Sequence, residues 1–445
     1  MKSASLLPVI AILLATCATP SPSCPTPGQS ECSGTCFDLQ ADAMNCGACG
    51  TVCGAQQTCQ AGKCSSSVCL APDVYAACWV GGGLVGICSE TGAQTPTAIV
   101  APAPGDGGGA AVVPDLQAGL FTGTNILWLL DTENNQLDVE DVGKWPPATL
   151  IAIPAAQGAS GQPADTTFSV DQILSCDGMV LALRTAVPLL EAYNTASPFA
   201  LVNEVSLASD AGYVYPAAVA CDGDHTAYVT DSANNTVTAV DLTTFTITGQ
   251  TSLPAMDRLG PFADAGPVSP SLTGIAFAET AAGPEVVVSL QNLANYEPIA
   301  ASTVFEIDPA LTTWKGPIDP GAQCVDAWQI VVSADQSTGY LACAGLFDSS
   351  NATAVQPYNS AGYVGVIDIG SKTAKAPLTT AVSNPTNLAV LKNGLLAIGD
   401  YSPQAEVGFY NPADGGVSYV NVNCPLLPDG GLNPQQGVTA VIAAP

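Results

Sequence analysis

The sequence has few charged residues, very few cations and a single histidine. Only 11% of its 445 residues are charged, and 9 Lys and Arg stand against 38 Asp and Glu, for a formal net charge of -29. A chain this acidic has no cationic surface for nucleic acid, which is therefore excluded as a partner. With His225 as the one histidine, a multi-histidine metal site is excluded. The hydrophobic fraction of 47% argues against disorder and predicts a large core.

The N-terminal apolar run, Leu6 to Leu14, is too short to span a bilayer, and it follows Lys2 as in an export signal. Leu14-Ala15-Thr16-Cys17 resembles a bacterial lipobox, although Thr16 departs from the usual Gly, Ala or Ser. We expect residues 1–16 to be a signal peptide and residues 17–23 a tether with a lipid on Cys17; the alternative is plain secretion with cleavage near Ala18. Because Ala18 is not the aspartate linked to inner-membrane retention, the resemblance implies an outer-membrane lipoprotein on the periplasmic or cell-surface side.

The cysteine count agrees with a lipid on Cys17. Seventeen is odd, and removing Cys17 leaves an even number for disulfides, as an exported chain prefers. Half of these crowd into a module at residues 24–64, poor in apolar residues, where we expect four disulfides of open pairing: Cys24, Cys32, Cys36, Cys46, Cys49, Cys53, Cys59 and Cys64. Zinc or redox chemistry at Cys46-x-x-Cys49 is the alternative.

The cysteine-rich module has further motifs. It carries Asp38-Leu39, Asn45-Cys46-Gly47 and Cys49-Gly50 within the run from Cys32 to Cys53. With these motifs it resembles the stigma-specific secreted cysteine-rich family. Similar modules stand ahead of larger domains in bacterial lipoproteins and secreted proteins.

From about Val74 onward, strand-length runs of Val, Ala, Thr and Leu alternate with turn residues, and helical periodicity is scarce. The segments Leu130–Val142 and Thr230–Leu242 share one pattern: a strand, an Asn-Asn turn, an alternating strand, and Asp before an apolar residue. Degenerate copies recur roughly every 50 residues, as blades of a β-propeller do. The pattern predicts six complete blades, near 113–152, 168–207, 214–253, 270–318, 325–378 and 384–422.

One repeat resembles a known family. Tyr228-Val229-Thr230-Asp231 and the strand after it resemble the propeller repeat named for Tyr-Val-Thr-Asn, with Asp231 in place of the final Asn. The resemblance implies a seven-bladed ring, as in surface-layer-type bacterial proteins, and no single activity. Strands between Val74 and Ile99 and one near 437–443 would complete the seventh blade. The expected fold class is thus all-β, a seven-bladed β-propeller over residues 69–445 closed by its N- and C-terminal strands, after a small disulfide-rich module.

Polar residues at the starts of the inner strands are the candidate channel binding residues, because inner strands line the channel of a propeller. They are Asp115, Gln117, Asp171, Gln172, Thr273, Asp326, Gln329, Asn387 and Gln436. The alternative is that they only satisfy backbone groups. We expect no metal or other cofactor and no catalytic residue; Ca²⁺ in the channel, or at Asp131, Glu133, Asn134 and Asp138, is the alternative. His225 lies in an apparent turn and is expected at the surface. Arg184 and Arg258 are the only arginines, too few for a site that binds a phosphosugar.

The dispersed cysteines are expected to form four further disulfides. Cys78 with Cys88 and Cys324 with Cys343 flank apparent hairpin turns, Cys176 and Cys221 end equivalent strands, and Cys69 and Cys424 remain. The expected function is that of a non-enzymatic, monomeric lipoprotein whose propeller binds an unknown protein or glycan at the cell envelope. A calcium-dependent hydrolase or lactonase, and a purely structural envelope component, are the alternatives.

Overall fold

The computed structural model describes residues 24–445 except 101–115, 155–169, 255–269, 346–361, 425–436 and several shorter gaps. The chain divides into two compact units, Met1–Ser67 and Val68–Pro445. No helix in the described ranges has the length and apolar character needed to cross a membrane.

The first unit is held together by cysteine pairs. It contains two short hairpins, β1 (Ser30–Cys32) with β2 (Thr35–Phe37) and β3 (Gln57–Gln60) with β4 (Lys63–Ser66). The four expected disulfides are Cys24–Cys36, Cys32–Cys49, Cys46–Cys59 and Cys53–Cys64. Cys46 and Cys49 therefore do not bond each other. A Cβ on Gly47 would lie 2.3 Å from the Gly62 carbonyl oxygen, so this close approach requires glycine.

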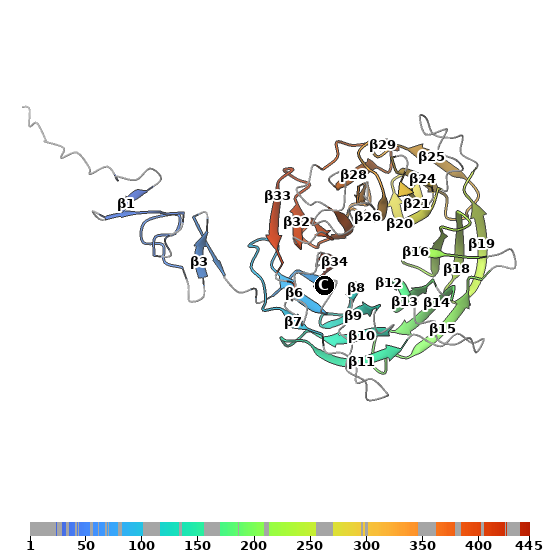
Figure 1. The fold of residues 1–445 in the computed structure, drawn as a ribbon, viewed down its shortest axis with the longest axis horizontal. Coiled ribbons are helices and arrows are strands. Elements are labelled where there is room, and N and C mark those ends of the chain that lie inside the picture. Colours follow the sequence, from blue (N-terminus) through green and yellow to red (C-terminus); the bar gives the residue numbers. More distant parts are fainter. Residues whose placement is uncertain are drawn as a thin grey trace, which may run out of the picture. The chain divides into compact units, whose positions relative to one another are not determined.

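The second unit consists of seven four-stranded antiparallel sheets arranged in a ring (Figure 1). We number the sheets as blades in chain order and give each from its inner to its outer strand. Blade 1 consists of β8 (Leu116–Thr122), β9 (Ile126–Asp131), β10 (Gln136–Asp141) and β11 (Ala148–Pro154). Blade 2 consists of β12 (Val170–Cys176), β13 (Met179–Arg184), β14 (Leu189–Asn194) and β15 (Leu201–Ser206). Blade 3 consists of β16 (Pro216–Cys221), β17 (Thr226–Asp231), β18 (Thr236–Asp241) and β19 (Thr246–Ser252).

Blades 4 to 6 repeat this order, and blade 4 carries a small extra hairpin of β22 (Leu293–Ala294) and β23 (Glu297–Pro298). Blade 4 consists of β20 (Leu272–Thr280), β21 (Gly283–Leu290), β24 (Thr303–Ile307) and β25 (Trp314–Ile318). Blade 5 consists of β26 (Ala327–Val332), β27 (Thr338–Cys343), β28 (Tyr363–Asp368) and β29 (Thr373–Ala374). Blade 6 consists of β30 (Pro385–Val390), β31 (Leu396–Asp400), β32 (Glu406–Tyr410) and β33 (Val417–Asn421).

Blade 7 joins the two ends of the propeller unit. Its inner strand is β34 (Val438–Ala443), which pairs with β5 (Val74–Cys78), and β6 (Gly83–Ile87) and β7 (Ala98–Ile99) follow outward. The structure thereby confirms the predicted fold class, a seven-bladed β-propeller closed by strands from both ends of the unit.

The core lies between neighbouring blades. The two middle strands of a blade are buried on both faces, as in β9 and β10, and this explains their unbroken apolar runs. Outer strands such as β15 are exposed along most of their length. One cluster illustrates the packing: Trp128 and Leu130 of blade 1 contact Ile173 and Tyr193 of blade 2.

Every inner strand has a β-bulge at its second residue. The pairing register shifts there in all seven, between Leu116 and Ala118 of β8, for example. Because all blades have the same strand order, the seven inner strands begin on the same face of the ring, which we call the entry face. The inner strands also contact one another in sequence around the ring.

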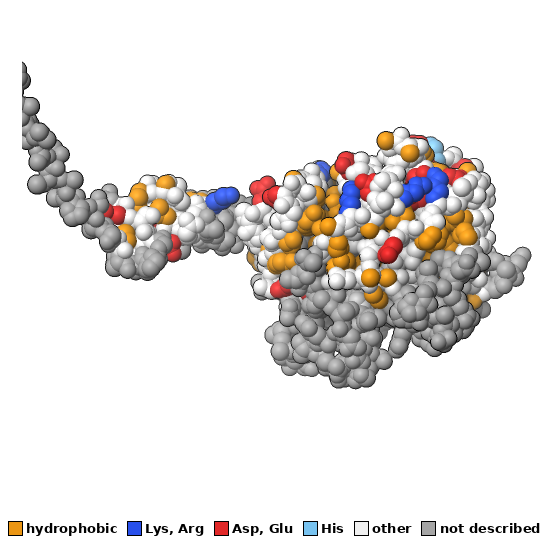
Figure 2. All heavy atoms as spheres, turned by 90° about the horizontal axis from the view of Figure 1, so that it is seen from above, with side chains coloured by type: hydrophobic (Ala, Val, Ile, Leu, Met, Phe, Trp, Pro, Cys, Tyr) orange, Lys and Arg blue, Asp and Glu red, His pale blue; other side chains and the backbone are white. Residues whose placement is uncertain are grey.

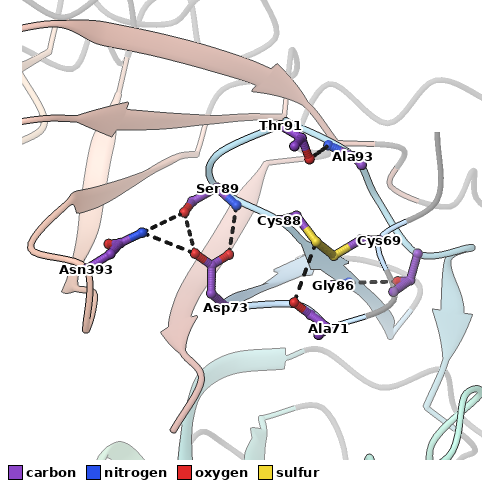
Figure 3. The surroundings of a disulfide bond; sticks show 10 residues. Cys69, Ala71, Asp73, Gly86, Cys88, Ser89, Thr91, Ala93 and Asn393 are labelled. Carbon is purple, nitrogen blue, oxygen red and sulfur yellow. Dashed lines mark hydrogen bonds between the residues drawn. A yellow bond between two sulfur atoms is a disulfide. The ribbon is translucent and has the colours of Figure 1, made fainter. Parts of the chain in front are cut away.

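Two of the disulfides expected in the propeller differ from the structure. Cys176–Cys221 and Cys324–Cys343 are present, but Cys78–Cys88 and Cys69–Cys424 are replaced by Cys69–Cys88 and Cys78–Cys424. The strand register explains the error. Val74 pairs with Ile87 and Ala77 with Leu84, so Cys78 and Cys88 lie at opposite ends of the hairpin. Cys88 instead lies beside the segment before β5, where Cys69 and Ala71 reach it (Figure 3).

Candidate functional site

Three of the candidate channel amides join neighbouring inner strands. Gln172, Gln329 and Asn387 are each the third residue of their strand. The fourth residue of the next inner strand donates its backbone N–H to each amide oxygen: Val219 to Gln172 Oε1 at 2.6 Å, Leu388 to Gln329 Oε1 at 2.6 Å, and Val441 to Asn387 Oδ1 at 2.8 Å. These side chains satisfy backbone groups between blades, and this is the structural alternative stated above.

Threonine side chains at the bulge position also join neighbouring inner strands. The Thr273 hydroxyl donates to the Ala327 carbonyl oxygen at 2.6 Å, from blade 4 to blade 5. Thr439, which the sequence patterns did not single out, donates in the same way from β34 to the Leu116 carbonyl oxygen. Its position at the bulge of the closing strand, equivalent to Thr273 in the repeat, was the signal that could have identified it.

The remaining channel candidates are dispersed. Asp115 and Gln436 lie outside the described residues, and Asp171 and Gln117 occupy bulge positions. Asp326 precedes β26 on the entry face and contacts a large exposed side chain.

That side chain is Trp328, the bulge residue of β26, which was not among the sequence-predicted residues. It is 52% exposed, whereas Asp326 is 8% exposed. The indole Nε1–H donates to Asp326 Oδ2 at 3.0 Å. Burial raises the pKa of Asp326 to about 6, and the hydrogen bond from Trp328 acts in the opposite direction. The overlooked signal was an aromatic residue at a position where the other copies of the repeat have Gln, Asp, Ala or Thr.

Two tyrosines are exposed at the start of another inner strand. Tyr213 is 72% and Tyr215 is 41% exposed, just before β16 on the entry face. Their ring centroids are 6.3 Å apart, and the Asn234 side-chain amide donates to the Tyr213 carbonyl oxygen at 2.8 Å. The entry face thus offers aromatic surface at blades 3 and 5.

Metal-ligand groups do not gather in the channel among the described residues. In the part of the chain that the structure describes, the one cluster with metal-ligand spacing is Cys46, Cys53 and Cys64, whose sulfurs are all in disulfides. Glu133 and Asn134 of the alternative calcium loop lie outside the described residues. At the matching turn, Asp231 Oδ1 accepts the backbone N–H groups of Tyr215 and Ala233 at 2.9 and 3.0 Å, as in a simple Asx turn.

The histidine and the described arginine have structural partners. His225 lies exposed on the turn after β16, and its Nδ1 is 2.7 Å from Asp177 Oδ2. The hydrogen bond to Asp177 raises the pKa of His225. Arg184 is buried and pairs with Glu191 at 3.1 Å. Arg258 lies outside the described residues.

Blade 1 contains buried carboxyl groups. Asp138 is 0% exposed; its Oδ1 accepts the Gln136 amide at 2.9 Å, and its Oδ2 has no hydrogen-bond partner among the described groups. Burial first, and then the charges of Asp131 and Glu140, raise the pKa of Asp138 to about 8. Burial also raises the pKa of Glu140 to about 7. Near neutral pH the Asp138 carboxyl therefore favours its protonated form in the folded chain.

No protein-family model matches the chain, and no curated protein matches it. Among the solved structures similar to it are the following three. A virginiamycin B lyase from Staphylococcus aureus has a TM-score of 0.48 at 10% identity, over 70% of this chain and 85% of that one. The Dos1 propeller gives 0.47 and 11%, over 72% and 74%. The Kuenenia stuttgartiensis hydrazine synthase gives 0.48 and 12%, over 69% and 80%. No activity is transferred from these proteins.

Proposed function

We propose that this protein is a non-enzymatic, monomeric lipoprotein of the outer membrane whose propeller binds a protein or glycan through its entry face. The observation that carries the proposal is the exposed indole of Trp328, hydrogen-bonded to Asp326 at the start of an inner strand. Aromatic side chains at interfaces contribute large apolar area with few rotatable bonds, and tryptophan is among the commonest hot-spot residues. Tyr213 and Tyr215 extend the same kind of surface.

The channel favours binding over hydrolysis. A calcium-dependent hydrolase or lactonase needs several carboxylates around one point, whereas the described channel amides are engaged by backbone groups. These amides are therefore unavailable as metal ligands, and the exposed aromatic side chains of the entry face are the reason for preferring a binding scaffold.

The test uses the full chain in a secreted Cys17→Ala form, mixed with washed envelopes of the cells that make the protein. We expect Trp328→Ala to weaken cosedimentation about thirtyfold, the effect of losing a hot-spot residue worth about 2 kcal/mol. Tyr419→Ala, which removes an exposed tyrosine on the outer strand β33, is the matched control and should bind as the parent does. Equal binding by parent and Trp328→Ala would refute a role for the entry face at Trp328.

Lipidation of Cys17 is the second part of the proposal. The disulfides indicate an extracellular or periplasmic protein. They use every cysteine except Cys17, which lies outside the described residues. We expect mass spectrometry of the mature N-terminus to find a diacylglycerol on Cys17, and detergent to be needed for extraction. An unmodified N-terminus at Ala18 or Thr19 would show plain secretion instead.

A further inference from the structure

The residue at the bulge of β26 differs in chemical type from the bulge residues of the other six inner strands. The other bulge residues are Gln117, Asp171, Ala217, Thr273, Thr386 and Thr439. Trp328 alone places an aromatic ring there, while its neighbours Ala327 and Ile330 are buried. A bulge redirects a side chain away from the regular alternation of a strand. The ring is therefore displayed at the entry face instead of being packed between blades.

The segment carrying Trp328 is fixed from several sides. Asp326 has a φ of 59°, in the left-handed region, and its carbonyl oxygen accepts the Ala344 N–H at 3.0 Å. The Ala327 N–H donates to Ser302 Oγ at 2.9 Å. The Cys324–Cys343 disulfide joins the segment to the end of β27. Because the backbone and the indole N–H are both held, little conformational entropy remains to be lost when a ligand binds.

The overall charge of the chain favours a positively charged ligand. The chain has a net charge of -29, and the described lysines of blades 4 and 5 lie at the face of the ring opposite Trp328, where each is paired with a carboxylate. Lys315 pairs with Glu285, Lys372 with Glu306 at 3.3 Å, and Lys375 with Asp368 at 3.2 Å. Figure 2 shows blue and red side chains next to one another on the face that it draws. Asp326 has no ion pair among the described residues.

We propose that Trp328 and Asp326 form a receptor for a positively charged side chain, an ammonium or guanidinium group on a basic peptide segment of the partner. A cation over the indole face is attracted by the ring, and the adjacent carboxylate adds a direct electrostatic attraction. This inference rests on the proposed binding function and specifies the chemistry of its ligand. A neutral sugar would also stack on the indole and donate hydroxyl hydrogen bonds to Asp326, but it would gain nothing from the negative charge of the chain.

The experiment measures binding of a fluorescein-labelled hexalysine peptide to the secreted full chain by anisotropy, in 0.15 M NaCl. Trp328→Leu removes the ring and keeps the charge; Asp326→Asn removes the charge and keeps an oxygen that can accept the indole N–H. We expect each to weaken binding about tenfold. Asp224→Asn, on the exposed turn between β16 and β17, removes the same charge elsewhere and should change binding less than about twofold.

The outcomes separate this inference from the proposed function. Equal affinity of the parent, Trp328→Leu and Asp326→Asn would show that the peptide responds only to the general negative charge, and the inference would be wrong. If Trp328 is protected from acrylamide quenching by the neutral glycan chitotriose but not by hexalysine, the inference is also wrong, while binding at the entry face stands. If cosedimentation with envelopes does not depend on Trp328, the proposed binding through the entry face at Trp328 is wrong.

Discussion

Deletion of residues 434–445 should leave the propeller open and cause aggregation or a large fall in melting temperature. The deletion removes β34, whose Val438, Val441 and Ile442 are buried against blades 6, 7 and 1. Burial of three such side chains is worth roughly 5 to 9 kcal/mol, which is comparable to the whole stability of a domain. The deletion also takes away the Val441 N–H that Asn387 accepts and exposes the edge of β5 to other chains.

Thermal melting followed by circular dichroism, together with size-exclusion chromatography, measures this effect. Removal of Pro445 alone is the control, because Pro445 follows β34 and is exposed. The Cys78–Cys424 disulfide stays in the truncated chain. Any loss can therefore be attributed to the strand. A truncated chain that remains monomeric and melts like the parent would contradict closure by β34.

The second large effect is expected at Asp138. In the unfolded chain its carboxyl loses its proton near the ordinary aspartate pKa of 3.8, whereas in the folded chain burial raises the pKa to about 8. Between these values the unfolded state binds fewer protons than the folded state, so the stability falls as the pH rises from about 4 to about 8. Asp138→Asn removes this penalty. We expect it to stabilise the protein by up to about 5 kcal/mol at pH 8 and to have little effect at pH 4.

Urea unfolding of Asp138→Asn and the parent at pH 4, 6 and 8 provides the measurement. The amide oxygen of the substituted residue can still accept the Gln136 hydrogen bond, so the local packing is kept. Asp224→Asn serves as the control, since Asp224 is on an exposed turn. A stability difference that does not grow with pH would show that Asp138 is not held protonated in the folded chain.

Local sequence patterns were sufficient for the propeller because each blade is built from short-range antiparallel pairings. The strand quartets could be recognised from alternation, turn residues and recurrence, as at Leu130–Val142 and Thr230–Leu242. The unpaired leading strand at the C-terminal end and the leaderless strands after Val74 likewise predicted the closing blade, because open sheet edges are unfavourable.

The cysteine pairs show where local patterns stop being sufficient. Cys78 and Cys88 are close in sequence and flank a turn, yet the register of β5 and β6 separates them. Cys424, 346 residues from Cys78, is the partner that the ring brings close. The sequence shows which cysteines are available to pair. Which of them do pair depends on strand register and on the contact between blades 6 and 7, because a disulfide needs two nearby cysteines in the right orientation.

The sequence by itself determined the seven-bladed ring, its closure and the acidic, disulfide-bonded character of the chain. The blades and the character of the chain follow from repeats of about 50 residues and from composition, and the closure follows from the incomplete strand sets at the two ends. Only the tertiary structure decided the roles of individual polar side chains. Gln172, Gln329 and Asn387 bind the backbone of the next blade, whereas Trp328 is exposed at a bulge. The physical reason is that a side chain's partner depends on the neighbouring blade, which lies close in space and distant in sequence.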